Sequence, residues 1–161
     1  MKAKITEYKG VHFRSRLEVK WCQFFESLGV SFEYEPELEK TSLGYYVPDF
    51  YFRSLKTWVE IKGVEPTEEE LTKIKEVCRN TGKSGFIISG YPKIYPAGVE
   101  PHLSNAMCYY ITNKGKSVKL SLDEIYQFIQ DPFILYKLKS CEETGSFVCV
   151  SADLMRCIKL Q

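Results

Sequence analysis

The sequence lacks any long hydrophobic run. Its longest apolar stretches, near residues 86–88 and 147–150, are far shorter than the roughly 20 residues that a membrane-spanning helix needs. Residues 1–10 contain no apolar segment of the kind found in secretory signals. We therefore expect a cytoplasmic protein with no membrane partner.

The sequence is also poor in the ligand patterns of structural zinc. It has six cysteines and two histidines, but no two cysteines form a C-x-x-C pair. Structural zinc sites favour ligands about two to four residues apart. We predict reduced cysteines that mostly pack in the core, in a reducing compartment, and no organic cofactor.

An excess of charge of one sign is missing as well. The chain has 22 basic and 21 acidic residues, a formal net charge of +1, so no overall field draws in nucleic acid. Basic residues do gather near the N-terminus, where Lys9, Arg14 and Arg16 lie close together in the sequence. For this segment, contact with a phosphate backbone and a solvated basic arm are even alternatives.

What is present suits one globular domain. A chain of 161 residues, 44% of them hydrophobic, is long enough to bury a real core, so we expect a single domain over 1–161. Apolar residues at helical spacing predict a helix over 15–29 that ends at Gly29. A second helix is expected to begin at Thr67, with Glu70 completing a capping box, and to end at Gly82.

The remaining segments of the first half read as strands. Residues 30–35 form one strand, 39–44 a turn-rich connection, and 45–63 a hairpin of two strands. Residues 84–90 are a short apolar run between glycines, and the helix before them favours parallel pairing. The order helix, strand, strand, strand, helix, strand predicts an α/β fold with a mixed central sheet flanked by helices.

Beyond Tyr91 the pattern changes to a proline-rich stretch and shorter elements. We expect strands at 106–112 and 117–122, a short helix over 121–131, and strands at 146–151 and 154–160. Residues 91–161 would then form a C-terminal α/β elaboration on the same core, and a separate small subdomain is the alternative.

Two carboxylates interrupt the apolar, aromatic hairpin at 45–63. Pairing of its strands would make Asp49 and Glu60 neighbours, with Lys62 on the same face as Glu60. At about 4 Å and an effective dielectric of about 20, two carboxylates repel by on the order of 4 kcal/mol. A hard divalent cation such as Mg²⁺ or Mn²⁺ would relieve that repulsion, and it would suit phosphoryl chemistry. Lys62 would orient an attacking water or stabilise charge that develops on the phosphate.

These residues carry a family resemblance. Pro48-Asp49 and, after a step of eleven residues, Glu60-Ile61-Lys62 reproduce the PD-(D/E)XK signature, so residues 8–90 resemble that nuclease superfamily, in particular its small phage and bacterial members. The resemblance implies a restriction-endonuclease-like core. It also implies a metal held by Asp49, Glu60 and the backbone carbonyl of Ile61, with an auxiliary carboxylate from Glu18 on the preceding helix.

Several of these residues have a second interpretation. Ser15 and Glu18 also fit a capping box, in which the Glu18 carboxylate turns back to its own helix. Tyr51 and Trp58 would pack across the hairpin rather than stack on a base. The glutamates of residues 33–37 are expected to be solvated.

The resemblance implies a Mg²⁺-dependent endonuclease that hydrolyses phosphodiester bonds in nucleic acid. DNA is the favoured substrate, and Mn²⁺ is expected to substitute for Mg²⁺. Arg14, Arg16 and Lys9 are the candidates for contact with that nucleic acid. The alternative is a catalytically inactive, nuclease-derived module that binds nucleic acid or a protein. Paired cuts on both strands would require a homodimer, and the sequence leaves the oligomeric state open.

Overall fold

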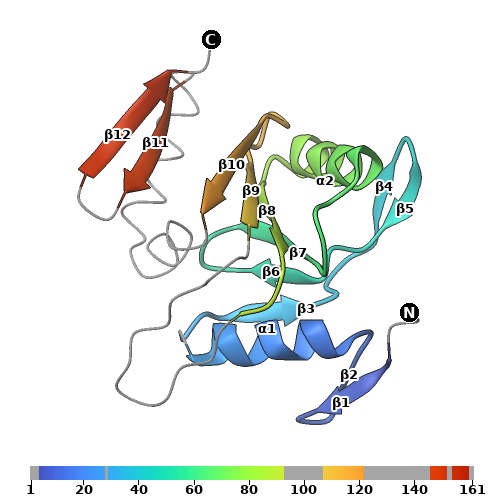
Figure 1. Cartoon of the computed structure of the whole chain (residues 1–161). Helices are drawn as coiled ribbons and strands as arrows, with labels where there is room; N and C mark the ends of the chain where they lie inside the picture. Colours follow the sequence, from blue (N-terminus) through green and yellow to red (C-terminus); the bar gives the residue numbers. More distant parts are fainter. Residues whose placement is uncertain (1–3, 28, 93–106, 122–145, 152–153, 160–161) are drawn as a thin grey trace.

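The protein has an α/β fold, in which the described residues form a mixed, six-stranded sheet with two helices (Figure 1). The computed structural model describes residues 4–27, 29–92, 107–121, 146–151 and 154–159. The strand order in the sheet is β10-β9-β8-β7-β6-β3. Its strands are β3 (Phe32–Tyr34), β6 (Phe50–Phe52), β7 (Thr57–Lys62), β8 (Ser84–Ser89), β9 (Met107–Ile111) and β10 (Ser117–Ser121).

The centre of the sheet is a hairpin followed by a parallel crossover. Strands β6 and β7 pair antiparallel, with Phe50 opposite Val59, and the chain turns between them at residues 53–56. Helix α2 (Glu68–Thr81) then carries the chain over the sheet to β8, which pairs parallel with β7. The predicted hairpin, helix and parallel pairing are confirmed.

Helix α2 forms for the local reasons that the sequence indicated. The Thr67 side chain accepts a hydrogen bond from the Glu70 N–H, and the Glu70 carboxylate accepts one from the Thr67 N–H. Gly82 ends the helix in the left-handed region at a φ of 66°, which costs glycine little. The predicted capping box and C-terminal stop are both confirmed.

The sheet separates two hydrophobic layers, because successive side chains of a strand point to opposite faces. Val59 and Ile61 face the core that contains helix α1 (Arg16–Ser27), whereas Trp58 faces the core that contains α2. In the first layer the Phe25 ring packs edge-on against Phe50 at a centroid distance of 5.4 Å. The two helices therefore cover opposite faces of the sheet, as Figure 1 shows.

Two short hairpins were not predicted. Residues 6–13, interpreted as part of a basic arm, form β1 (Thr6–Tyr8) and β2 (Val11–Phe13), joined by a tight turn in which Lys9 and Gly10 both have positive φ. The turn-rich connection at 39–44 was also an incorrect prediction. It contains β4 (Glu39–Thr41), which pairs with β5 (Gly44–Tyr46).

The second hairpin shortens the strand that was expected to run from residue 45. Tyr46 pairs with Glu39 of β4 rather than with the central sheet, and β6 begins only at Phe50. Pro48 separates the two strands, since proline has no N–H to donate to a ladder.

The sheet continues beyond residue 90, the expected end of the core. Strand β9 pairs antiparallel with β8, and β10 pairs antiparallel with β9 across the predicted turn. The two strands were predicted, but their addition to the edge of β8 was not. Strands β11 (Ser146–Ser151) and β12 (Leu154–Lys159) form a two-stranded antiparallel sheet. Both strands were predicted, but their pairing with each other was not. The helix predicted over 121–131 lies, after residue 121, outside the described residues.

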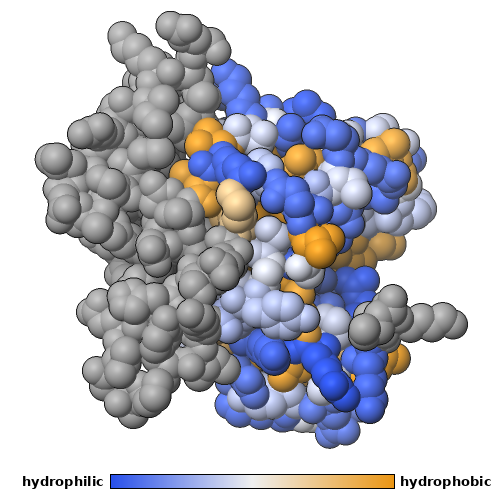
Figure 2. Space-filling view, viewed as in Figure 1, coloured by the Kyte–Doolittle hydropathy of each residue, from blue (hydrophilic) through white to orange (hydrophobic). Residues whose placement is uncertain are grey.

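Neither described helix is long and apolar enough to cross a membrane. In the view of Figure 2, hydrophilic residues cover most of the described surface, and hydrophobic residues form small separate groups. Exposed apolar side chains that are scattered in this way are normal for a folded domain. The informative feature of the molecule is instead a set of buried charges.

Candidate functional site

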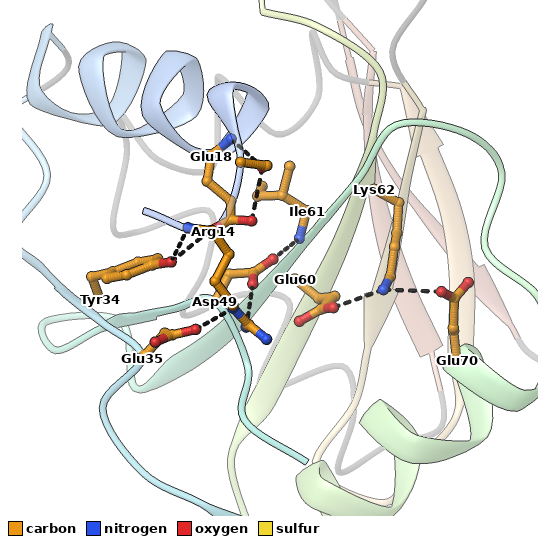
Figure 3. Close-up of polar contacts among 10 residues, drawn as sticks. Arg14, Glu18, Tyr34, Glu35, Asp49, Glu60, Ile61, Lys62 and Glu70 are labelled. Carbon is orange, nitrogen blue, oxygen red and sulfur yellow. Dashed lines mark hydrogen bonds and ion pairs between the residues drawn. The ribbon is translucent and has the colours of Figure 1, made fainter. Parts of the chain in front are cut away.

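Buried charged residues converge where β6 begins and β7 ends. The β6–β7 register pairs Phe50 with Val59, and one further step places Asp49 opposite Glu60. Both side chains are buried, with exposed fractions of 3% and 5%. Figure 3 shows their carboxyl groups as neighbours.

Asp49 is held in place from two sides. The Ile61 N–H donates to its Oδ2 at 2.7 Å, and the Arg14 guanidinium donates to its Oδ1 at 3.1 Å. Burial raises the pKa of Asp49 well above its ordinary value, and the charges of Glu60 and Glu18 raise it further. The contacts with Ile61 and Arg14 lower that pKa, but they do not cancel the rise.

Lys62 lies between two carboxylates. Its Nζ is 2.9 Å from Glu60 Oε1 and 3.0 Å from Glu70 Oε1. Burial lowers the pKa of Lys62, but attraction to Glu60 and hydrogen bonds to both glutamates outweigh burial, so the pKa is raised. The ammonium is therefore charged at neutral pH and fixed in direction.

The charges form a row in which the signs alternate except at one point. Glu35 pairs with Arg14, and Arg14 pairs with Asp49. On the other side Glu60 pairs with Lys62, which also pairs with Glu70. In Figure 3 the two halves meet at Asp49 and Glu60, where two negative groups adjoin. That junction is where an added cation would relieve the most repulsion.

The residues at this junction fit a hard divalent cation. The Oε2 atom of Glu60 is buried and makes no hydrogen bond of normal distance and angle, although a buried carboxylate oxygen normally makes one. Carboxylate and carbonyl oxygens are the ligands that Mg²⁺ prefers. Within the described residues no three His, Cys, Asp or Glu side chains gather closely enough to hold a metal. The fit therefore rests on Asp49, Glu60 and the main-chain carbonyl of Ile61.

Glu18 lies near the junction, but its carboxylate is already engaged. Ser15 Oγ donates to its Oε1 at 2.8 Å, and the Tyr34 hydroxyl donates to its Oε2 at 2.6 Å. Ser15 Oγ also accepts from the Glu18 N–H, which caps the first turn of α1. The structure thus contains the local cap of the second interpretation, while the Glu18 charge still acts on Asp49.

The three basic candidates are placed differently. Arg14 lies in the site, with 55% of its side chain exposed. Arg16 is exposed in the first turn of α1. Lys9 pairs with Glu26, which lies about 12 Å along α1 from Glu18, so the fold does not bring Lys9 to the carboxylates.

The aromatic pair of the hairpin packs as expected. Tyr51 and Trp58 are cross-strand neighbours with ring centroids 4.6 Å apart. The Lys83 ammonium lies over both rings, at 4.6 Å and 4.8 Å from their centroids. These faces are therefore occupied by contacts within the fold.

Three residues of the site were missed. Glu35 was expected to be solvated rather than a ligand, and its pairing with Arg14 was not foreseen. The Tyr34 hydroxyl accepts a hydrogen bond from the main-chain N–H of Arg14 at 3.0 Å and donates one to the Glu18 carboxylate. Glu70 was recognised only as a cap, yet a helix that starts directly after the Lys62 strand was a signal that it lies within reach.

Comparison of the chain with protein-family models, with curated proteins and with solved structures finds no match. The functional argument therefore depends on the residues of this chain.

Proposed function

We propose that the protein is a metal-dependent nuclease of the PD-(D/E)XK type. The observation that carries this proposal is the pair of buried, adjoining carboxylates, Asp49 and Glu60, beside the fixed ammonium of Lys62. Apart from the inserted β4–β5 hairpin, the chain order α1, β3, β6, β7, α2, β8 supports a restriction-endonuclease-like core, since that order is the one the signature implies. Cleavage of DNA within the strand is the favoured activity.

Asp49, Glu60 and the Ile61 carbonyl would hold Mg²⁺ or Mn²⁺. The bound ion supplies Lewis-acid polarisation of a phosphate oxygen and an acidified water. The main-chain N–H of Ile61 orients Asp49 for this role. Because this donor belongs to the backbone of a strand, it holds the carboxylate in a fixed direction. Glu18 adds negative potential from α1 without needing to leave Ser15 and Tyr34.

Lys62 would act on the substrate directly. Its pairing with Glu60 and Glu70 keeps the ammonium protonated and limits its rotation. A fixed positive charge stabilises a phosphate whose negative charge grows in the transition state. Arg14 has a largely exposed guanidinium next to Asp49, and a guanidinium binds phosphate oxygens well, so it would hold the neighbouring backbone.

The test is cleavage of single-stranded, duplex, flapped, branched and RNA substrates with Mg²⁺ or Mn²⁺. We expect the wild type to cut at least one DNA substrate, and Asp49→Asn, Glu60→Gln and Lys62→Met each to lose roughly 10²–10⁴-fold in rate. Glu33→Gln is the matched control, because Glu33 pairs with Arg53 on the neighbouring strand pair. Cleavage that persists in Asp49→Asn at the wild-type rate would refute the proposal.

The second candidate is an inactive module that binds nucleic acid or a protein. It is favoured by one observation, namely that Asp49 and Glu60 each already contact a cation of the protein. In that case the chain would bind its partner equally well with and without Mg²⁺, and no substrate of the panel would be cut. Nucleic-acid binding measured in EDTA and in Mg²⁺ separates the two candidates.

A further inference from the structure

Two buried side-chain atoms in the described part of the chain make no hydrogen bond of normal distance and angle: Oε2 of Glu60 and the hydroxyl of Tyr46. Unpaired buried polar atoms are rare in folded proteins, and each one calls for an explanation. Two of them in one region are more informative than either alone. Tyr46 has no role in the site as described so far.

Tyr46 belongs to the same region as Glu60. It is the last residue of β5, and its ring packs against the core that contains Trp58 and helix α2. Strand alternation places Glu60 on that same face of β7, two residues after Trp58. Glu60 acts on the hydroxyl both through its charge and through a side-chain contact of hydrogen-bond type, and the charge of Asp49 adds to this effect. The hydroxyl therefore faces the Glu60 carboxylate, close to the junction of the two carboxylates.

The hydroxyl is a hydrogen-bond donor. Burial raises the pKa of Tyr46 well above its ordinary value, and the negative charge of Glu60 raises it further. The phenol therefore keeps its proton. A phenylalanine would fill the same space in the core without burying a hydroxyl that makes no well-formed hydrogen bond, so packing alone gives no reason for tyrosine.

We propose that Tyr46 is a positioning residue of the metal site, and that its hydroxyl hydrogen-bonds a water molecule in the shell of the ion held by Asp49 and Glu60. The inference rests on the proposed function. Mg²⁺ usually keeps several of its waters in protein sites, and these waters need partners. Groups that hold such partners in place contribute strongly to metal affinity.

The test compares Tyr46→Phe with Tyr45→Phe in the full chain. Tyr45 is the adjacent residue of β5 and is 70% exposed, so its hydroxyl provides a matched control. For Tyr46→Phe we expect roughly tenfold weaker Mn²⁺ binding by calorimetry. We also expect a higher melting temperature of the metal-free protein, because a buried hydroxyl without a well-formed hydrogen bond is gone. Tyr45→Phe should change neither quantity.

The two readouts separate this role from a purely structural one. A hydroxyl that merely supports the fold would lower the melting temperature when removed and leave Mn²⁺ affinity unchanged. Either unchanged affinity or a lower melting temperature in Tyr46→Phe overturns the inference and leaves the nuclease proposal standing. If the wild type takes up no Mn²⁺ even with nucleic acid present, both proposals fail.

Discussion

Asp49 is the residue at which the needs of the site and of the fold differ most. Its carboxylate is buried, adjoins Glu60 and feels the charge of Glu18, and all three effects raise its pKa. The ionised form that would bind a metal is therefore the form that the metal-free fold tolerates poorly. Functional sites often carry this conflict between activity and stability.

The first prediction concerns Asp49→Asn. Because the folded pKa of Asp49 is raised, the folded state binds the proton more tightly than the unfolded state does. Its contribution to stability is then greatest below the ordinary aspartate pKa of about 4, and is lost as the pH rises through the folded pKa. We expect Asp49→Asn to raise the metal-free stability at pH 7–8 by about 1–2 kcal/mol.

Urea denaturation of both proteins between pH 4 and pH 8 measures this effect. The advantage of Asp49→Asn should shrink towards pH 4, where the wild-type carboxyl is protonated in the folded state. Glu33→Gln, in an exposed ion pair with Arg53, should show no such trend. A variant that is less stable than the wild type at pH 8 would show that the Arg14 contact outweighs burial.

At the residue scale, the sequence was sufficient to predict the central pair but not its neighbours. Period-two alternation and hairpin spacing place Asp49 beside Glu60, since both effects act within a few residues. Arg14 and Glu35 reach Asp49 from other elements, and their contact depends on how those elements pack. No periodicity within one segment encodes such a contact.

The elements themselves differ in how far local sequence determines them. Helix α2 was predictable from end to end, because Thr67, Glu70 and Gly82 act within one turn of the backbone that they cap. The hairpins β1–β2 and β4–β5 were missed because their short strands are mostly exposed or half-buried and lack the continuous aromatic run that marked the equally short β6. Charged residues in both segments also made them look like solvated loops.

The second prediction tests how closely α2 lies on the sheet. A Cβ added at Gly85 of β8 would lie 2.8 Å from Cys78 Sγ and 3.3 Å from Ile74 Cγ1, both on α2. We expect Gly85→Ala to lower the free energy of unfolding by about 1–3 kcal/mol, because the helix must shift outward. Urea denaturation with fluorescence detection measures the loss.

Gly63→Ala is the control for this substitution. A Cβ at Gly63 would meet Leu17 Cδ2 at 3.9 Å, an ordinary van der Waals contact. We expect its stability to stay within about 0.5 kcal/mol of the wild type. Equal effects at the two glycines would argue against close packing between α2 and β8.

At the scale of the whole molecule, the sheet is larger than the segment that carries the signature. Strand β9 covers one edge of β8 and contributes buried residues to both hydrophobic layers, with Tyr110 in the layer of α1 and Ile111 in that of α2. The sequence resemblance ended near residue 90. The residues of β8 contain no local signal that a later strand pairs with its edge. The extent of the sheet was therefore not predictable from the motif.

The third prediction follows from that extent. A chain that ends after residue 92 would leave β8, with its six buried residues, as an unprotected edge strand. We expect this truncated chain to lose cooperative unfolding and to aggregate, because exposed apolar edges pair with one another. Circular dichroism melts and size-exclusion chromatography against the full chain measure both properties. A monomeric, cooperatively folding truncated protein would show that β9 is dispensable.

The arrangement of the two layers has an optical consequence. The chain contains two tryptophans, Trp21 in the layer of α1 and Trp58 in the layer of α2, and both are almost fully buried. Their indole N–H groups are bound differently, Trp21 to the Gly90 carbonyl and Trp58 to the Thr81 hydroxyl. Each side of the sheet thus has its own fluorescent tryptophan. When one tryptophan is replaced with phenylalanine, the fluorescence of the other reports the unfolding of its own layer. Comparing the two variants shows whether the layers unfold together or one before the other.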